Sequence, residues 1–75
     1  MSKIEEIGKE LIKDIRKDLE QIYPRLKEYL EKNQPNLLAL YEDYYQKAMY
    51  NPNPFIASEY AYRIFRAYIS LKTSE

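Results

Sequence analysis

The sequence predicts an all-α fold: a small three-helix up-down-up bundle with a long first helix that is kinked at a proline. Three observations predict this fold. Apolar residues recur at spacings of three and four along three segments of the chain, which is the period of an amphipathic helix. Two clusters rich in Asn and Pro, at residues 33–36 and 51–54, separate the segments and favour turns. A chain of 75 residues with one glycine and no long linker fits a single helical domain over 1–75, with helices expected at about 3–32, 35–50 and 54–72.

The first expected helix begins with a capping signal. Ser2 and Glu5 fit a capping box, in which the hydroxyl and the carboxylate each accept a hydrogen bond from a backbone amide at the start of the helix. Further along, the apolar residues share one helical face, and Ile12, Tyr23 and Leu30 widen one side of it. The residues expected to form the core of the bundle are Leu11, Ile15, Leu19, Ile22, Leu26, Tyr41, Tyr44, Ile64 and Tyr68.

Pro24 lies inside this pattern and allows two interpretations. A proline removes one helical hydrogen bond and disfavours helical geometry at the preceding residue, here Tyr23. The first helix therefore either ends at about Ile22, with a short helix after it, or continues with a kink. The apolar period runs through Pro24 without a change of phase, and no Gly or Asn supplies a stop. We therefore expect one long helix with a kink at Pro24.

The third expected helix carries more apolar surface than one core-facing side requires. The residues of its first, core-facing stripe are Ala57, Tyr60, Ala61, Ile64, Tyr68 and Leu71. A second stripe, which we define as Tyr62, Phe65 and Ile69, lies on another side at the same spacings. Either this helix sits centrally and buries both stripes, or the second stripe is a contact surface between subunits or with another protein. We favour the contact surface, with Phe65 as its anchor and with Arg63 and Arg66 at its rim.

The residue inventory argues against catalysis. The chain has no His and no Cys, which excludes the Ser-His-Asp and Cys-His nucleophile systems and the usual zinc sites. Its single glycine excludes a phosphate-binding loop. Acidic pairs such as Glu5-Glu6 and Glu42-Asp43 fall away from the apolar stripes, so we expect solvated helix surfaces there rather than a metal site. We expect a protein that is not an enzyme and that needs no cofactor or metal.

The charges of the chain cancel, with twelve basic and twelve acidic residues. A neutral chain lacks the basic field that marks most proteins that bind nucleic acids or anionic membranes. On the first helix, an acidic row runs beside a basic row, and we interpret the pair as a solvated face rather than a docking strip. The residues of the two rows are Glu6, Glu10, Asp14 and Asp18, and Lys9, Lys13 and Lys17.

The run Tyr44-Tyr45-Gln46-Lys47-Ala48-Met49, followed by Asn51-Pro52-Asn53, resembles the end of the second helix of a tetratricopeptide repeat. In that family, a similar aromatic, Lys-Ala and Pro-Asn run leads into the next repeat. The likeness covers residues 44–53, and no second copy of the pattern occurs in the chain. It implies a helical hairpin formed by the second and third helices, and it carries no site residues over.

These observations lead to one favoured function and one alternative. No apolar run approaches a membrane span and the first residues are charged, so we expect an intracellular, cytoplasmic protein with no membrane partner. The composition, tyrosine-rich and without Cys, is typical of thermophiles. We expect a helical protein-interaction module that forms a homodimer or docks to a protein partner. The alternative is a nucleic-acid-binding protein that uses Arg63 and Arg66 with Tyr62.

Overall fold

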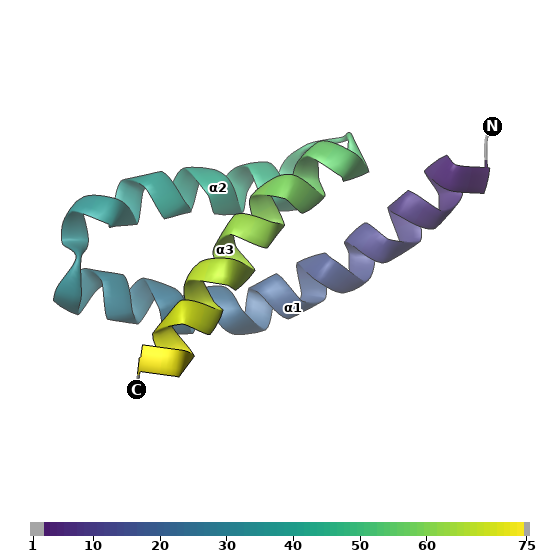
Figure 1. The fold of residues 1–75 in the computed structure, drawn as a ribbon. Coiled ribbons are helices and arrows are strands. Elements are labelled where there is room, and N and C mark those ends of the chain that lie inside the picture. The colour runs from purple at the N-terminus through teal and green to yellow at the C-terminus, as the bar shows by residue number, and fades with distance from the viewer. Residues whose placement is uncertain (1–2, 75) are drawn as a thin grey trace.

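The computed structural model describes residues 3–74, and these residues form three α-helices and one short 3-10 helix without any strand. Helix α1 spans Lys3–Asn33, the 3-10 turn η1 spans Pro35–Leu37, α2 spans Leu38–Tyr50 and α3 spans Pro54–Ser74. The prediction of an all-helical chain with three helices is confirmed. Helix α3 packs against both α1 and α2, and the first half of α1 extends past the turn that joins α2 to α3 (Figure 1).

Helix α1 continues through Pro24. The alternative in which the first helix ends at about Ile22 is therefore wrong, whereas the kink at Pro24 stays a prediction. The 31 residues of α1 correspond to a length of about 46 Å at 1.5 Å per residue. This length matches the longest dimension of the molecule, 45 Å, so α1 alone sets how long the bundle is.

The two Asn-Pro clusters end one helix and begin the next, as the sequence predicts. The second helical segment starts with the 3-10 turn η1 instead of an α-helical turn, because Leu37 N donates to Gln34 O at 3.0 Å and Pro35 has no amide hydrogen to donate. At the second cluster, Asn53 caps α3: its Oδ1 accepts hydrogen bonds from Phe55 N at 2.9 Å and from Ile56 N at 3.4 Å. Pro54 then occupies the first turn, where no amide hydrogen is required.

The core is centred on a different side of α1 from the side that the sequence predicts. Of the nine expected core residues, Leu19, Leu26 and Ile64 are buried. Leu11, by contrast, is 57% exposed, so the prediction for this residue is wrong. Five further expected core residues are half-buried: Ile15, Ile22, Tyr41, Tyr44 and Tyr68. The buried residues are Ile12, Leu19, Tyr23, Leu26, Leu30, Ala48, Ala57, Ala61 and Ile64.

The physical reason for this shift lies in where α2 and α3 meet α1. The alanines at 48, 57 and 61 are at most 1% exposed, and their small side chains allow the helix backbones to come close together. This packing covers the side of α1 that carries Ile12, Tyr23 and Leu30. Leu11 lies next to Ile12 in the sequence but on the edge of the apolar face that neither α2 nor α3 covers.

Arg16 joins the middle of α1 to the end of α2. Its Nε donates to Ala48 O at 2.9 Å and a terminal guanidinium nitrogen donates to Asn51 O at 2.8 Å. These are backbone carbonyls at the end of a helix, which lack partners within the helix. A cation at that end also interacts favourably with the helix dipole. Arg16 therefore closes the α2–α3 turn onto α1.

Helix α1 meets the start of α3 at Gly8. A β-carbon at Gly8 would lie 3.4 Å from Cγ of Pro54 and 3.6 Å from Cζ of Phe55, which are ordinary van der Waals distances. We expect Gly8→Ala to raise the free energy of unfolding by about 0.5–1 kcal/mol, because alanine removes the entropic penalty of glycine in a helix interior. Urea unfolding followed by circular dichroism measures this change.

The control for this prediction is the reverse substitution, Ala39→Gly, at an exposed position of α2. It is expected to lower the free energy of unfolding by a similar amount, about 0.5–1 kcal/mol. A loss of stability in Gly8→Ala would contradict the spacing between α1 and α3 at this contact.

Across the described residues, no helix combines the length and the apolar character that crossing a membrane needs.

Candidate interaction surface

Large apolar side chains remain exposed in a group on α1 and α3. Seven large apolar side chains among the described residues expose more than half of their surface, and six of these come from the first half of α1 and from α3. We call this set the apolar face. Its members are Ile4, Ile7, Leu11, Phe55, Tyr62 and Ile69. Scattered apolar residues such as Tyr50 are ordinary on protein surfaces, whereas grouped ones mark contact sites.

The second stripe of α3 lies at the boundary between the core and the surface. Tyr62 is 64% exposed and Ile69 is 60% exposed, whereas Phe65 is half-buried and packs against the core cluster. Phe55, Tyr62 and Ile69 follow one another at seven-residue intervals, so they lie on nearly the same side of α3. The stripe therefore offers two exposed side chains, one helical turn before and one after a partly buried aromatic ring.

Arg63 and Arg66, the two arginines expected at the rim of the second stripe, lie in different surroundings. The guanidinium of Arg63 lies 4.9 Å from the ring centroid of Tyr60 and 5.2 Å from that of Tyr44, in the range of a cation–π contact. Arg66 is exposed, and helical spacing places it beside Tyr62 and Ile69. Within residues 3–74, neither guanidinium forms an ion pair.

The exposure of the α1 part of the apolar face, Ile4, Ile7 and Leu11, is not indicated by the sequence. Ile4 and Leu11 lie one turn before and one turn after Gly8, which meets Phe55, and they border this contact on the edge of α1 that α3 leaves uncovered. The contact at Gly8 therefore joins the exposed residues of α1 to those of α3. Periodicity alone assigned these residues to the apolar stripe of the first helix, and only the placement of α3 reveals that they stay uncovered.

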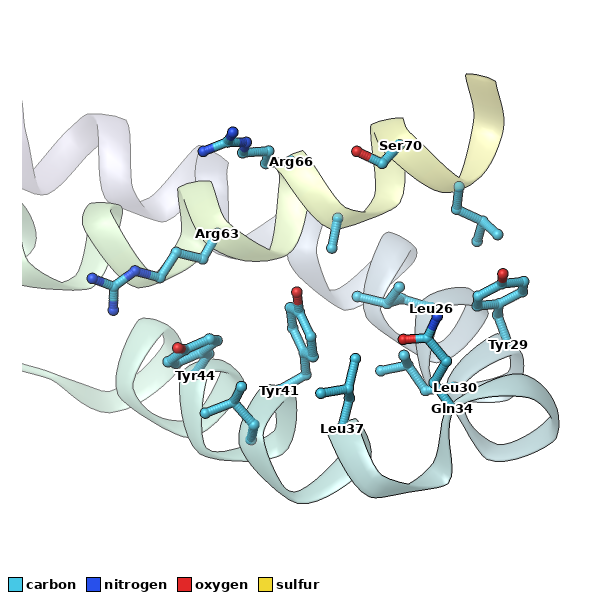
Figure 2. A pocket seen from close by; sticks show the side chains of 13 residues that line it. Leu26, Tyr29, Leu30, Gln34, Leu37, Tyr41, Tyr44, Arg63, Arg66 and Ser70 are labelled. Atoms are coloured by element: carbon cyan, nitrogen blue, oxygen red, sulfur yellow. The ribbon is translucent and has the colours of Figure 1, made fainter. Parts of the chain in front are cut away.

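A groove lies between α2 and α3, next to the end of α1 (Figure 2). It has a volume of about 580 Å³ and an apolar floor that includes Leu26, Leu30 and Leu37. The ring of Tyr41 stands in this groove with its hydroxyl directed toward α3, and Arg63 extends over Tyr44 at one end (Figure 2). The guanidinium of Arg63 contacts Tyr44 and Tyr60 and is therefore not directed at a ligand position in the groove. With its apolar floor, the groove resembles a loosely packed edge of the core.

Among residues 3–74, the fold shifts the pKa of Tyr23 most strongly. Its ring stacks on Tyr45 with centroids 4.1 Å apart and planes 10° from parallel. Burial raises the pKa of Tyr23 to about 12, and the negative charges of Glu42, Tyr45 and Glu31 act in the same direction. The Tyr23 hydroxyl is buried without a hydrogen-bond partner in the described chain. Because of the raised pKa, the Tyr23 phenol keeps its proton at neutral pH.

No cluster suited to a cation accompanies these surfaces: among residues 3–74, no group of three or more carboxylates gathers into a metal-binding arrangement. The most distinctive surface of the molecule is therefore the apolar face. Comparison of the chain with protein-family models, with curated proteins and with solved structures finds no match.

Proposed function

We propose that the protein is a non-catalytic helical interaction module that self-associates or docks to a protein partner through the second stripe of α3. The observation that carries this proposal is the exposure of Tyr62 and Ile69, 64% and 60%, on a helix whose opposite side already supplies the core. Exposing such residues to water is unfavourable by about 25 cal/mol per Å² of apolar area. A partner that covers them removes this penalty.

The residue inventory supports a binding role over a chemical one. The chain has no His and no Cys, so proton transfer and nucleophilic attack at neutral pH would depend on carboxylates, lysines, tyrosines or Ser and Thr hydroxyls without the usual His or Cys partner. Tyrosines, in contrast, are well suited to contact surfaces, because a large rigid ring covers much area at a modest entropic cost.

The alternative of nucleic-acid binding has weaker support. It needs Arg63 and Arg66 to reach phosphates together with Tyr62. The contacts of Arg63 with Tyr44 and Tyr60 turn this guanidinium toward α2. One free arginine on a chain with zero net charge supplies little of the electrostatic attraction on which such binding depends.

We also infer the finer course of the bundle, with the three helices up, down and up and with a bend in α1 at Pro24. Pro24 has no amide hydrogen to donate to the carbonyl of Glu20, and a missing bond on one side of a helix lets it bend toward the other. Residual dipolar couplings measured on residues 3–22 and 25–33 report the angle between the two parts. A straight helix would contradict the bend.

Tyr62→Glu tests the proposed function. We expect this variant to stay folded and to lose self-association, because a charge at an exposed position is tolerated in the monomer but must be desolvated in a contact. Sedimentation equilibrium over a range of protein concentrations provides the readout, and the wild type is expected to exceed its monomer mass of 9.1 kDa. Phe65→Glu is expected to lose association as well, but it also lowers stability because Phe65 packs on the core.

Tyr50→Glu is the matched control. Tyr50 is 73% exposed and lies at the end of α2, away from the second stripe. The same chemical change at this position is expected to leave association unaffected. If Tyr62→Glu and Tyr50→Glu behave alike, the second stripe has no special role in binding.

A further inference from the structure

We propose that the partner is a second copy of this chain, and that the first half of α1 in each copy packs on α3 of the other, with Asp18 of one copy paired with Arg66 of the other. This inference rests on the proposed function and extends it in two ways. It names the occupant of the surface, and it adds Ile7 and Leu11 of α1 to the second stripe of α3.

The first argument is area. An aromatic side chain covers about 150–250 Å² and Ile or Leu somewhat less, so the six members of the apolar face, each more than half exposed, expose roughly 600 Å² together. That area is at the upper end of the largest patch on a typical monomer, about 300–600 Å². Half-buried Ile15, Ile22 and Phe65 lie on the same sides of their helices and extend the patch. A stable dimer needs about 800 Å² per partner, which this combined surface approaches.

The second argument is that the surface is complementary to itself. A dimer with two-fold symmetry requires a patch that matches its own copy. Helix α3 and the first half of α1 run in the same general direction (Figure 1). A two-fold axis parallel to them, lying between them in the apolar face, places α1 of each copy over α3 of the other. Such an axis leaves the height of each residue along the bundle unchanged.

This symmetry sets which residues meet. Gly8 lies level with Phe55, because the two residues are in contact. Ten residues further along each helix, Asp18 is level with Phe65 and therefore about one residue from Arg66. In the dimer, Asp18 of one copy faces Arg66 of the other, and the second such pair follows from the symmetry.

The third argument is charge. Asp18 borders the apolar side of α1 next to Ile15 and Ile22, and Arg66 borders the second stripe. Both residues are exposed, and neither forms an ion pair within the described part of the chain. In the proposed dimer, Asp18 on α1 of one copy meets Arg66 on α3 of the other, so opposite charges face each other at both contacts. A dimer that placed the two α1 helices together would instead bring the two Asp18 carboxylates close and would be disfavoured by their repulsion.

A pair of charge reversals tests the arrangement. Asp18→Arg and Arg66→Asp each place like charges together twice per dimer, so each variant alone is expected to weaken dimerisation by about tenfold. An equimolar mixture of the two variants contains only opposite-charge pairs in the mixed dimer. We expect the mixture to regain association close to that of the wild type, as measured by sedimentation equilibrium of the separate and combined variants.

The control is Glu31→Arg, a reversal at an exposed residue on a different side of α1 from Asp18. It is expected to leave dimerisation unchanged. If the mixture associates no better than the two variants alone, the pairing of Asp18 with Arg66 is wrong.

One further variant separates the failure of this inference from the failure of the proposed function. Leu11→Glu is expected to fold, because Leu11 is 57% exposed, and to abolish dimerisation. If Leu11→Glu dimerises normally while Tyr62→Glu does not, α1 is not part of the interface but the second stripe keeps its role. If the wild type is a monomer at all concentrations, the homodimer is excluded and only docking to a different protein remains for the second stripe.

Discussion

Replacing Ile64 with alanine is expected to lower the free energy of unfolding by about 2–5 kcal/mol. Ile64 is fully buried, at 0% exposed, in the same core cluster as Leu19 and Leu26. The substitution removes apolar contacts and leaves a cavity that the neighbouring helices can close only in part. A domain of this size has about 5–15 kcal/mol of stability in total, so the variant is expected to unfold at a much lower urea concentration.

Leu11→Ala is the matched control for this experiment. It removes a similar side chain from a position that is 57% exposed, so it is expected to change stability by about 0.5 kcal/mol or less. The measurement should be made at a protein concentration where the chain is monomeric, so that any effect on association does not contribute. Equal losses in Ile64→Ala and Leu11→Ala would mean that the core has been assigned to the wrong side of α1.

Tyr23→Phe is expected to stabilise the protein and to remove much of its sensitivity to alkaline pH. The buried hydroxyl of Tyr23 lacks a partner within residues 3–74, and burying a polar group without one costs about 1–3 kcal/mol. Phenylalanine keeps the ring that stacks on Tyr45 and removes the hydroxyl. At neutral pH, we expect the free energy of unfolding to rise by about 1 kcal/mol.

The sign of the pH dependence follows from the raised pKa of Tyr23. In the unfolded chain Tyr23 ionises near pH 10, whereas in the folded chain its pKa is about 12. Below pH 10 both states hold the proton, so the contribution to stability is fully present. Between pH 10 and 12 the unfolded state loses the proton first, and at most about 2–3 kcal/mol of stability is lost over that interval, less where solvent screens the charge.

Urea unfolding of the wild type and of Tyr23→Phe at pH 8 and pH 11 measures this difference. The variant is expected to lose less stability between the two pH values. Tyr50→Phe, at an exposed position, is the control and should follow the wild type. Parallel losses in all three proteins would show that the Tyr23 hydroxyl does not control the alkaline transition.

The positions of the helices could be predicted from the sequence because local rules determine them. Apolar residues three and four apart, together with the Asn-Pro clusters at 33–36 and 51–54, depend only on neighbours along the chain. The side of α1 that is buried could not be predicted in the same way. The run of apolar residues around α1 is wide enough to include both Leu11 and Ile12. Which of the two is buried depends on where α2 and α3 pack.

The candidate surface also has a part that the sequence predicts and a part that depends on tertiary packing. The second stripe could be recognised because Tyr62 and Ile69 repeat on a side of α3 that the core does not need. The half-burial of Phe65 and the contacts of Arg63 with Tyr44 and Tyr60 depend on tertiary packing, and no spacing in the sequence indicates them. For the same reason the two hydrogen bonds of Arg16 to the α2–α3 turn could not be foreseen.

The attachment of Arg16 to this turn has a consequence for how α1 holds its shape. It fastens α1 near its midpoint, and the residues after it pack on two helices, whereas Ile4, Ile7 and Leu11 before it remain largely exposed to water. Short helical segments with few tertiary contacts are only marginally stable, so in a single copy the beginning of α1, which meets α3 at Gly8, is expected to open more readily than the rest of the helix. Any molecule that binds there must also hold this segment in its helical form. The strength of that association therefore depends on the helix propensity of residues that need not touch the partner.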